Sequence, residues 1–278
     1  MRPYAFAGGC ALITGAASGI GAALATALAD RGSNLVVLDR DADRLATVAQ
    51  GVQAAHPGLA VAAYVADLSD DTELDRICAE MLADHPEVTL LINNAGVALG
   101  GRLDQVTLEE FDWVMAVNFR SVVRLTHAFL PVLKAHPGAH LVNVSSVFGI
   151  MAPAGQAAYS ASKFAVRGFS EAVRHELAEN GVGVTVVHPG GIKTRIAESA
   201  RTGSGVSAEE LEQGRKQFAK LLRIAPEDAA AQIVAAIEKR RPRLLIGASA
   251  KIPDVLVRLM PGSYWKLIAR RAGRPASR

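Results

Sequence analysis

Three side chains near the middle of the chain have the types and spacing needed for proton transfer. Tyr159 and Lys163 are four residues apart in a helical pattern that begins near Gln156, which places them on one helix face, one turn apart. A tyrosine with an ordinary pKa of about 10 is a poor acid or base at neutral pH. A neighbouring ammonium group favours the phenolate and brings this pKa toward the working range. Ser146 closes a strand-like run and can hold a substrate oxygen against the tyrosine hydroxyl.

A glycine-rich turn near the N-terminus has the pattern of a phosphate-binding site. The strand-like run Ala11–Thr14 leads into the turn, and the apolar helical segment Ala22–Ala29 follows it. Glycines let the backbone approach a pyrophosphate closely, and the helix N-terminus attracts the anion. Because the strand before and the helix after are the context that this motif requires, we predict a dinucleotide site that includes Gly15, Ser18, Gly19, Ile20 and Gly21.

The end of the next strand indicates which dinucleotide is bound. Asp39 ends that strand, where a carboxylate can accept hydrogen bonds from the adenosine ribose. A 2′-phosphate at this point would meet a negative charge, so we predict NAD as the preferred cofactor. Arg40 follows directly, and because its guanidinium group can hold a phosphate, NADP stays open as the alternative.

Together with further motifs, these residues resemble the short-chain dehydrogenase/reductase family across about residues 8 to 247. Their order and spacing along the chain fit that family, including the thirteen residues from Ser146 to Tyr159. The motifs are Thr14-Gly15-x-x-x-Gly19-x-Gly21, Asp67-Leu68, Asn93-Asn94-Ala95-Gly96, Asn118, Ser146, Tyr159-x-x-x-Lys163 and Pro189-Gly190 with Thr194.

The resemblance implies an oxidoreductase that interconverts a secondary or primary alcohol and its ketone or aldehyde. Tyr159 would be the general acid-base, Ser146 would stabilise the substrate oxygen, and Lys163 would bind the ribose and lower the Tyr159 pKa. Asn118 would kink its helix and hold a water molecule that links Lys163 to solvent. The hydride chemistry belongs to the cofactor, and no metal is needed. The further cofactor contacts that the resemblance implies come from Asp67, Leu68, Asn94, Ala95, Gly96, Pro189, Gly190, Ile192 and Thr194.

Apolar runs that alternate with helical segments predict the elements that must position these residues. Most of the runs are continuously apolar, as in parallel strands covered on both faces. We predict one Rossmann-type, doubly wound α/β domain over residues 1–278, with about seven strands, helices on both faces and a helical extension over 248–278. Capping boxes at Thr107 with Glu110 and at Ser207 with Glu210, and Pro226 in a first turn, mark helix starts. The predicted strands are Ala11–Thr14, Leu35–Leu38, Val61–Val65, Leu90–Ile92, Leu141–Ser145, Val184–Val187 and Leu244–Ile246.

The C-terminal extension is basic and amphipathic. Residues 238–278 carry a net charge of +9, which leaves −6 for the rest of the chain. We expect a helix with Pro253 in its first turn, packed over the substrate site or against a second subunit. The alternative is a peripheral membrane contact. The apolar residues expected on this surface are Ile252, Val255, Leu256, Leu259, Tyr264, Trp265, Leu267 and Ile268.

The residues expected on the substrate side are largely apolar, which favours a lipophilic alcohol or carbonyl compound. The segment 191–222 is the predicted mobile lid, and Lys193 and Arg195 are its exceptions to the apolar pattern. The expected lining residues are Val97, Ala98, Leu99, Val147, Phe148, Ile150 and Met151, with Ile196, Phe218, Leu221 and Leu222 from the lid.

Several other classes of protein are disfavoured. The two cysteines are far apart and no histidine cluster accompanies them, so neither a disulfide framework nor a zinc site is predicted, and a cytoplasmic protein is expected. The uncharged segment Tyr4–Ala29 could pass for a secretory or membrane segment, but its five glycines predict a strand, a turn and a helix instead. No motif supports nucleic-acid binding.

Some alternatives concern the site and the assembly. We expect Ser145 to be a strand-end hydrogen-bonding residue. No nucleophile elbow accompanies His175 or His188, so both are expected to be structural. The resemblance implies a homodimer or homotetramer that pairs through the helices of Asn118 and Tyr159. A non-catalytic, NAD(P)-binding regulatory protein, and an isomerase or epimerase that uses the cofactor transiently, are the alternative functions.

Overall fold

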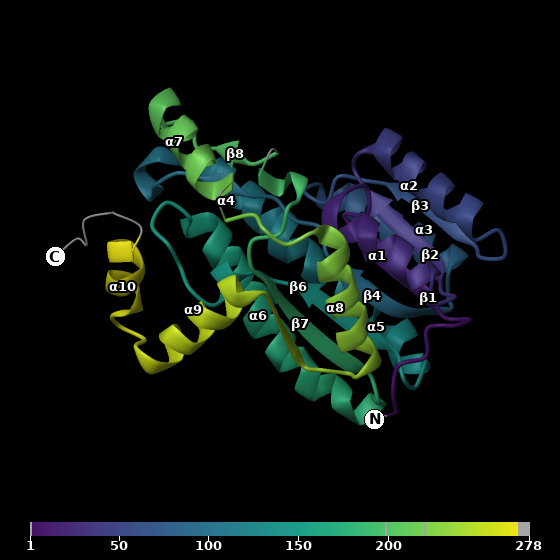
Figure 1. Cartoon of the computed structure of the whole chain (residues 1–278). Coiled ribbons are helices and arrows are strands. Elements are labelled where there is room, and N and C mark those ends of the chain that lie inside the picture. The colour runs from purple at the N-terminus through teal and green to yellow at the C-terminus, as the bar shows by residue number, and fades with distance from the viewer. Residues whose placement is uncertain (1, 198, 220, 272–278) are drawn as a thin grey trace.

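A sheet of seven parallel strands in the order β3-β2-β1-β4-β6-β7-β9 forms the centre of the molecule (Figure 1). The computed structural model describes residues 2–197, 199–219 and 221–271, without the side chains of residues 197, 215, 217, 218 and 268–271. Every predicted strand is present, and its ends lie within two residues of the predicted ones. The strands are β1 (Cys10–Thr14), β2 (Asn34–Asp39), β3 (Val61–Val65), β4 (Val88–Asn93), β6 (His140–Val144), β7 (Gly183–Pro189) and β9 (Arg243–Ile246).

Two layers of helices cover the two faces of the sheet. In β1, Ile13 belongs to the core on one face and Leu12 to the core on the other, because successive strand residues point to opposite faces. Both kinds of position are buried, which explains the continuously apolar strands and confirms the doubly wound fold. One layer contains α1 (Gly19–Ala29), α2 (Ala42–Ala55) and α8 (Pro226–Glu238), and the other α3 (Asp71–Asp84), α5 (Ser121–Ala135) and α6 (Ala157–Leu177).

The winding of the chain reverses between β1 and β4, which are neighbours in the sheet. Ala11 of β1 pairs with Leu35 of β2 on one side and with Leu90 of β4 on the other. At such a switch point the connections leave in opposite directions, and a crevice opens beyond the carboxyl ends of the strands. The site residues are therefore expected at this edge of the sheet.

The predicted helix starts are confirmed. Before α4 (Leu108–Met115), Glu110 N donates to Thr107 Oγ1 and Thr107 N donates to a Glu110 carboxylate oxygen. Ser207 and Glu210 exchange the same two bonds before α7 (Ala208–Ala219), and Pro226 is the first residue of α8.

The uncharged N-terminal segment forms β1, the glycine turn and α1, as predicted. Within the described ranges, no helix has the length and hydropathy required to cross a bilayer.

The C-terminal extension forms two helices, α9 (Ala248–Leu259) and α10 (Tyr264–Arg271). An ion pair fastens α9 to the edge strand β9, since Arg243 Nη1 donates to Asp254 Oδ2 over 3.1 Å. Arg258 adds a second contact, with Nε 3.2 Å from the same carboxylate oxygen. The hydrogen bond from Arg243 is the main reason why the pKa of the buried Asp254 lies below its usual value.

The predicted position of Pro253 in a first helical turn is wrong. Gly247 adopts a positive φ of 81°, which lets the chain turn into α9 directly after β9, so the helix begins five residues before the proline. Inside the helix, Pro253 has no amide hydrogen for the Ser249 carbonyl. The helix packs against the 3-10 helix that follows Ser146, but its apolar face, expected over the substrate site or against a second subunit, is not covered by the described part of this chain, because Ile252 and Leu259 are 56% and 75% exposed.

A second, two-stranded sheet ties the predicted lid to the loop after β4. It pairs β5 (Leu99–Gly100) with β8 (Arg201–Thr202). Beside it, the Arg201 guanidinium lies 3.8 Å from the centre of the Trp113 ring of α4, a cation–π contact. These two-residue strands leave no apolar pattern in the sequence and were not predicted.

Candidate active site

Helix α6 brings Tyr159 and Lys163 to the carboxyl edge of the sheet. The helix begins at Ala157 with Gln156 as its N-cap, so both residues lie in its first two turns, as the spacing predicts. The Lys163 Nζ lies 5.8 Å from the centre of the Tyr159 ring and donates a 3.0 Å hydrogen bond to the carbonyl oxygen of Val144, the last residue of β6. The cation is thereby held between the tyrosine and the end of the strand.

Burial changes the proton affinity of both side chains, in opposite senses. Lys163 is only 3% exposed, and desolvation lowers its pKa to about 8. Burial also raises the pKa of Tyr159 above its ordinary value, and a hydrogen bond with Ser146 partly counteracts this. The expected lowering of the Tyr159 pKa relies on Lys163 together with the positive nicotinamide ring, and it stays a prediction for the cofactor complex. Without the cofactor, the loss of hydration of the phenolate is the largest influence on this pKa.

Ser146 is held in place by two elements. Its Oγ accepts a 3.1 Å hydrogen bond from Phe148 N at the start of a short 3-10 helix, Val147–Gly149. Its carbonyl oxygen lies 3.0 Å from Nδ1 of His188 on β7, and because a carbonyl only accepts, the Nδ1 proton must be present. Burial lowers the pKa of His188 to about 4, so this ring is neutral at neutral pH. It supports the serine backbone.

The other candidate catalytic residues, Ser145 and His175, have contacts typical of structural residues. Ser145 Oγ donates to the Lys163 carbonyl oxygen over 2.8 Å and thus joins β6 to α6, as expected for a strand-end residue. His175 is exposed on the later part of α6, where its Nε2 lies 3.3 Å from an Arg174 nitrogen.

Asn118 connects the loop after β4 to α6. It is fully buried, in a π-helical turn over Ala116–Arg120, so the expected irregularity of its helix is present. Its side chain accepts from Val97 N (2.8 Å) and donates to Val97 O (2.9 Å) and Ser162 Oγ (3.0 Å). These bonds fix the loop that follows Gly96. A Cβ on Gly96 would lie only 3.2 Å from Lys163 Nζ, so the loop approaches the lysine closely where a glycine stands.

The glycine turn has the shape that a pyrophosphate requires. Gly15 and Gly19 adopt positive φ values of 68° and 56°. A Cβ on Gly21 would lie 2.0 Å from the Gly15 carbonyl oxygen, so α1 begins as close to the turn as a glycine allows. Ser18 is the N-cap of α1 but makes no side-chain capping bond within the described chain, and Ile20 lies in the first turn. The first amide groups of the helix therefore remain available to an anion.

Asn94 joins the glycine turn to the next strand. Its Nδ2 donates to Thr14 O over 2.9 Å and to Gly15 O over 3.2 Å. The Thr14 hydroxyl accepts from Asn94 N and Ala95 N, a role that sequence reasoning missed because it joins residues eighty positions apart. Across the turn, a Cβ on Gly19 would lie 2.9 Å from Thr194 Cγ2, which places Thr194 over the predicted phosphate site.

The other predicted cofactor residues surround the same crevice. Asp39 ends β2, and its carboxylate accepts from Ala17 N over 3.0 Å, while Arg40 is exposed beside it. The Asp67 carboxylate accepts from Ser69 N and Oγ, and the next residue, Leu68, is buried. Pro189 ends β7, Gly190 follows it, and Ile192 is buried and bridged to Ile224. The residues present thus fit a dinucleotide in the crevice.

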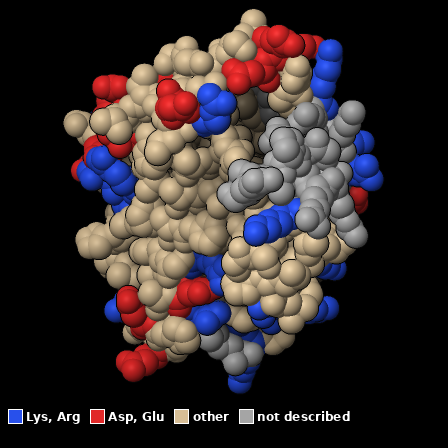
Figure 2. All heavy atoms as spheres, turned by 90° about the vertical axis from the view of Figure 1, so that its left-hand side faces the viewer, with Lys and Arg blue, Asp and Glu red and all other residues tan. Residues whose placement is uncertain are grey.

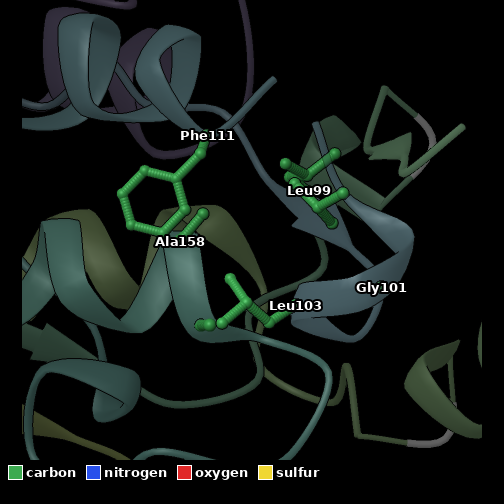
Figure 3. A pocket seen from close by; sticks show the side chains of 7 residues that line it. Leu99, Gly101, Leu103, Phe111 and Ala158 are labelled. Atoms are coloured by element: carbon green, nitrogen blue, oxygen red, sulfur yellow. The ribbon is translucent and has the colours of Figure 1, made fainter. Parts of the chain in front are cut away.

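A small apolar pocket lies beside the start of α6 (Figure 3). In Figure 3, Phe111 and Ala158 face it from one side and Leu99 from the other. Of the predicted substrate-side residues, Leu99 lines this pocket, Ile150 and Met151 are buried, and the Phe148 ring lies 6.0 Å from the Tyr159 ring. In the predicted lid, Leu221 is 55% exposed, and the Phe218 side chain is outside the described part. The lining residues are Leu99, Gly101, Leu103, Val106, Phe111, Ala157 and Ala158.

The C-terminal extension also reaches the site. Tyr264 of α10 accepts a 3.2 Å hydrogen bond from Ala152 N, in the loop between Ser146 and Tyr159. Ser249 of α9 accepts a bond from Gly191 N over 3.2 Å, at the start of the predicted lid. Sequence reasoning missed both contacts, since no local pattern links residues so far apart.

Comparisons with known proteins agree with this architecture. A family model described as short chain dehydrogenase matches residues 9–205. The chain is 40% identical over 270 residues to a putative oxidoreductase of Mycobacterium tuberculosis, SadH, with 95% of each chain covered. It is similar to a short-chain dehydrogenase/reductase from Burkholderia phymatum in complex with NAD, with a TM-score of 0.83, 28% identity and coverage of 99% of this chain and 98% of that one. A short-chain dehydrogenase from Sphingobium yanoikuyae in complex with NADPH has a TM-score of 0.76, 27% identity and coverage of 94% and 95%.

Proposed function

The chain belongs to the short-chain dehydrogenase family, and on that premise we propose that this oxidoreductase interconverts an alcohol and its ketone or aldehyde. The observation that carries the proposal is the convergence of Tyr159, Lys163 and Ser146 at the carboxyl edge of the sheet, where the glycine turn also lies. A proton-transfer group thus stands beside a site with the shape for a dinucleotide.

In the proposed reaction, Tyr159 manages the proton of the substrate oxygen. When an alcohol is oxidised, the phenolate of Tyr159 takes the hydroxyl proton while the carbinol carbon loses a hydride and becomes a carbonyl carbon. Ser146 Oγ donates a hydrogen bond to the substrate oxygen and holds it against the phenol. The bound nicotinamide cofactor supplies the hydride chemistry. Lys163 holds the cofactor ribose and keeps a positive charge near the phenol, and Asn118 fixes the loop beside it.

Because burial alone raises the pKa of Tyr159, ionisation of the phenol is expected to depend on positive charge from Lys163 and from the oxidised cofactor together. We therefore expect alcohol oxidation to become faster as the pH rises and the phenolate fraction grows. The rate measured against pH, with saturating cofactor, checks this expectation. A rate that falls steadily as the solution becomes alkaline would contradict it.

We propose NAD as the preferred cofactor, because the Asp39 carboxylate lies where the adenosine ribose is expected and would repel a 2′-phosphate. The relatives are named with NAD and with NADPH, so they support either cofactor. Titration of the purified protein with NADH and NADPH measures the two dissociation constants. Tighter binding of NADPH would contradict the proposal and would point to Arg40.

A lipophilic substrate is supported by the apolar side chains around the pocket in Figure 3 and after Ser146. A panel of long-chain, terpenoid and steroid-like alcohols, with small polyols for comparison, tests it through the absorbance of reduced nicotinamide. Higher kcat/KM for the polyols than for every lipophilic compound would reject it. Binding of cofactor without turnover of any compound would favour a regulatory protein.

The mechanism is tested by Tyr159→Phe, which removes only the phenolic oxygen. We expect kcat to fall by at least about a hundredfold, the usual contribution of a positioned acid-base group, while cofactor affinity changes little. Tyr64→Phe is the matched control, because that hydroxyl bonds Asp84 and His85, away from the site. Unchanged turnover in Tyr159→Phe would exclude the proposed proton transfer.

A further inference from the structure

Helix α9 presents an apolar stripe to the outside of the molecule. Ile252, Val255 and Leu259 are 56%, 53% and 75% exposed, and their spacing of three, four and seven places them on one face. Ala250 and Asp254, on the opposite face, are buried against the protein. Single exposed apolar residues are ordinary on a protein surface. Several of them on one face of a helix that packs against the protein through its other face indicate an interaction surface.

Positive side chains flank this stripe. Lys251 begins a groove that continues between α8 and β9 and includes Lys239 and Arg241. Arg243 and Arg258 are paired with Asp254, whereas among the described residues no carboxylate lies within ion-pair distance of Lys239, Arg241 or Lys251. Figure 2, which views the side of the molecule that carries α7, α9 and α10, shows wide uncharged areas with basic groups beside them.

We propose that α9 is a docking surface for a membrane that contains anionic phospholipids. Ile252, Val255 and Leu259 enter the boundary between headgroups and acyl chains, and Lys251, Lys239 and Arg241 contact lipid phosphates. An amphipathic helix that lies in the interface gains free energy from the apolar area it buries and from attraction to anionic lipids. The stripe supplies the first contribution, and Lys251, Lys239 and Arg241 supply the second.

The other candidate occupants fit the surface less well. A second copy packed stripe to stripe would bring the cations around Lys251 and Arg258 of both copies together, and like charges across an interface are unfavourable. The C-terminal residues 272–278 contain no leucine, isoleucine, valine, methionine or aromatic residue. They can offer the stripe little apolar surface, and their two arginines add positive charge.

The docking surface is directly connected to the site. Helix α9 packs against the 3-10 helix that follows Ser146, and Ser249 at its start holds Gly191 of the predicted lid. A docked molecule would thus have the rim of its site near the lipid, where apolar compounds concentrate. Membrane binding by α9 does not require the proposed reaction. The docking proposal and the proposed function can therefore be tested, and rejected, independently.

Vesicle flotation of the full chain tests the proposal, with phosphatidylcholine alone and with phosphatidylcholine mixed with phosphatidylglycerol. We expect binding to the mixed vesicles only. Ile252→Ser with Val255→Ser and Leu259→Ser should weaken it at least about tenfold, and Lys239→Gln with Arg241→Gln and Lys251→Gln about fivefold for each charge. Leu108→Ser, at a 78% exposed leucine on α4, is the control and should bind as the unmodified chain does.

Three outcomes would overturn the proposal. These are no binding to the mixed vesicles, equal binding to both vesicle types, or binding that the serine and glutamine variants leave unchanged. Sedimentation velocity of the same proteins identifies a second copy as the occupant, if the serine variant dissociates an oligomer while vesicle binding stays the same. Circular dichroism and NADH titration of each variant establish that its fold is retained.

Discussion

Burial of the Tyr159–Lys163 pair sets the chemistry of individual residues in the site. Desolvation raises the pKa of the phenol above 10.0 and lowers that of the ammonium from 10.5 to about 8, so the two proton affinities move apart and the phenol becomes the group that holds its proton more tightly. A base that is harder to ionise is also a stronger base once it is ionised, and the neighbouring cation stabilises its charged form. Proton exchange with a substrate near neutral pH is therefore expected to require the positive charge of Lys163 and of the bound oxidised cofactor together.

The lowered pKa of Lys163 makes the stability of the protein depend on pH. Between about pH 8 and 10.5, the folded lysine has lost its proton while the unfolded lysine keeps it, so this residue adds stability as the pH rises. Lys163→Met removes that contribution. We expect the stability of the variant relative to the unmodified protein to decrease steadily across this range, measured by urea denaturation at several pH values.

Lys134→Met is the matched control, because Lys134 is exposed on α5. The difference in free energy of unfolding between Lys134→Met and the unmodified protein should stay constant across the same pH range. A constant difference for Lys163→Met as well would mean that the buried lysine keeps an ordinary pKa.

Some contacts between elements require a glycine, because a Cβ atom at that position would collide with a neighbouring element. At Gly21, α1 touches the turn that follows β1, and a Cβ would meet the Gly15 carbonyl oxygen. At Gly51 in α2, a Cβ would meet nothing within 4 Å. The same residue type therefore has a steric role in one helix and only an entropic cost in the other.

The two glycines predict opposite effects of the same substitution. Gly51→Ala should increase the free energy of unfolding by roughly 0.5–1 kcal/mol, because alanine loses less backbone freedom in a helix. Gly21→Ala should decrease that free energy and weaken NADH binding, since α1 must move away from the turn. Chemical denaturation and NADH titration measure both effects. A Gly21→Ala variant with unchanged NADH affinity would show that the turn does not hold the pyrophosphate.

The elements were predictable where local pattern determines them. Continuous apolar runs identified the seven strands, and hydroxyl and carboxylate side chains at Thr107 and Glu110 identified a helix start. The start of α9 was not predicted, because a positive φ at Gly247 determines it and the sequence pattern favoured Pro253. The strands β5 and β8 exist through tertiary pairing alone.

The site was predictable in its membership but not in its energetics. Spacing brought Tyr159 and Lys163 together, and the glycine pattern placed the turn. How deeply the two side chains are buried depends on packing among β6, α6 and the loop that Asn118 holds, which no local pattern specifies. The contact of Tyr264 with Ala152 depends in the same way on the path of the last two helices.

For the whole molecule, we propose a homodimer or larger homo-oligomer through α5 and α6, as the family resemblance implies. Phe164 is 40% exposed on α6, immediately after Lys163. Phe164→Asp should dissociate the oligomer into smaller species, because the substitution would bury a charge in the interface. Sedimentation velocity measures the mass, with Leu108→Asp at an exposed leucine of α4 as the control. An unchanged mass for Phe164→Asp would place the contact elsewhere.

The bonds from Asn94 to Thr14 and Gly15 join parts of the chain that are synthesised about eighty residues apart. A nascent chain that ends before β4 already contains the residues of the glycine turn. It lacks Asn94, whose side chain holds that turn in place. Affinity for the dinucleotide should therefore appear only late, when both halves of the sheet have assembled. A ligand that binds only this assembled form shifts the folding equilibrium toward it, so the nucleotide supply of the cell would act as a selective stabiliser of finished molecules.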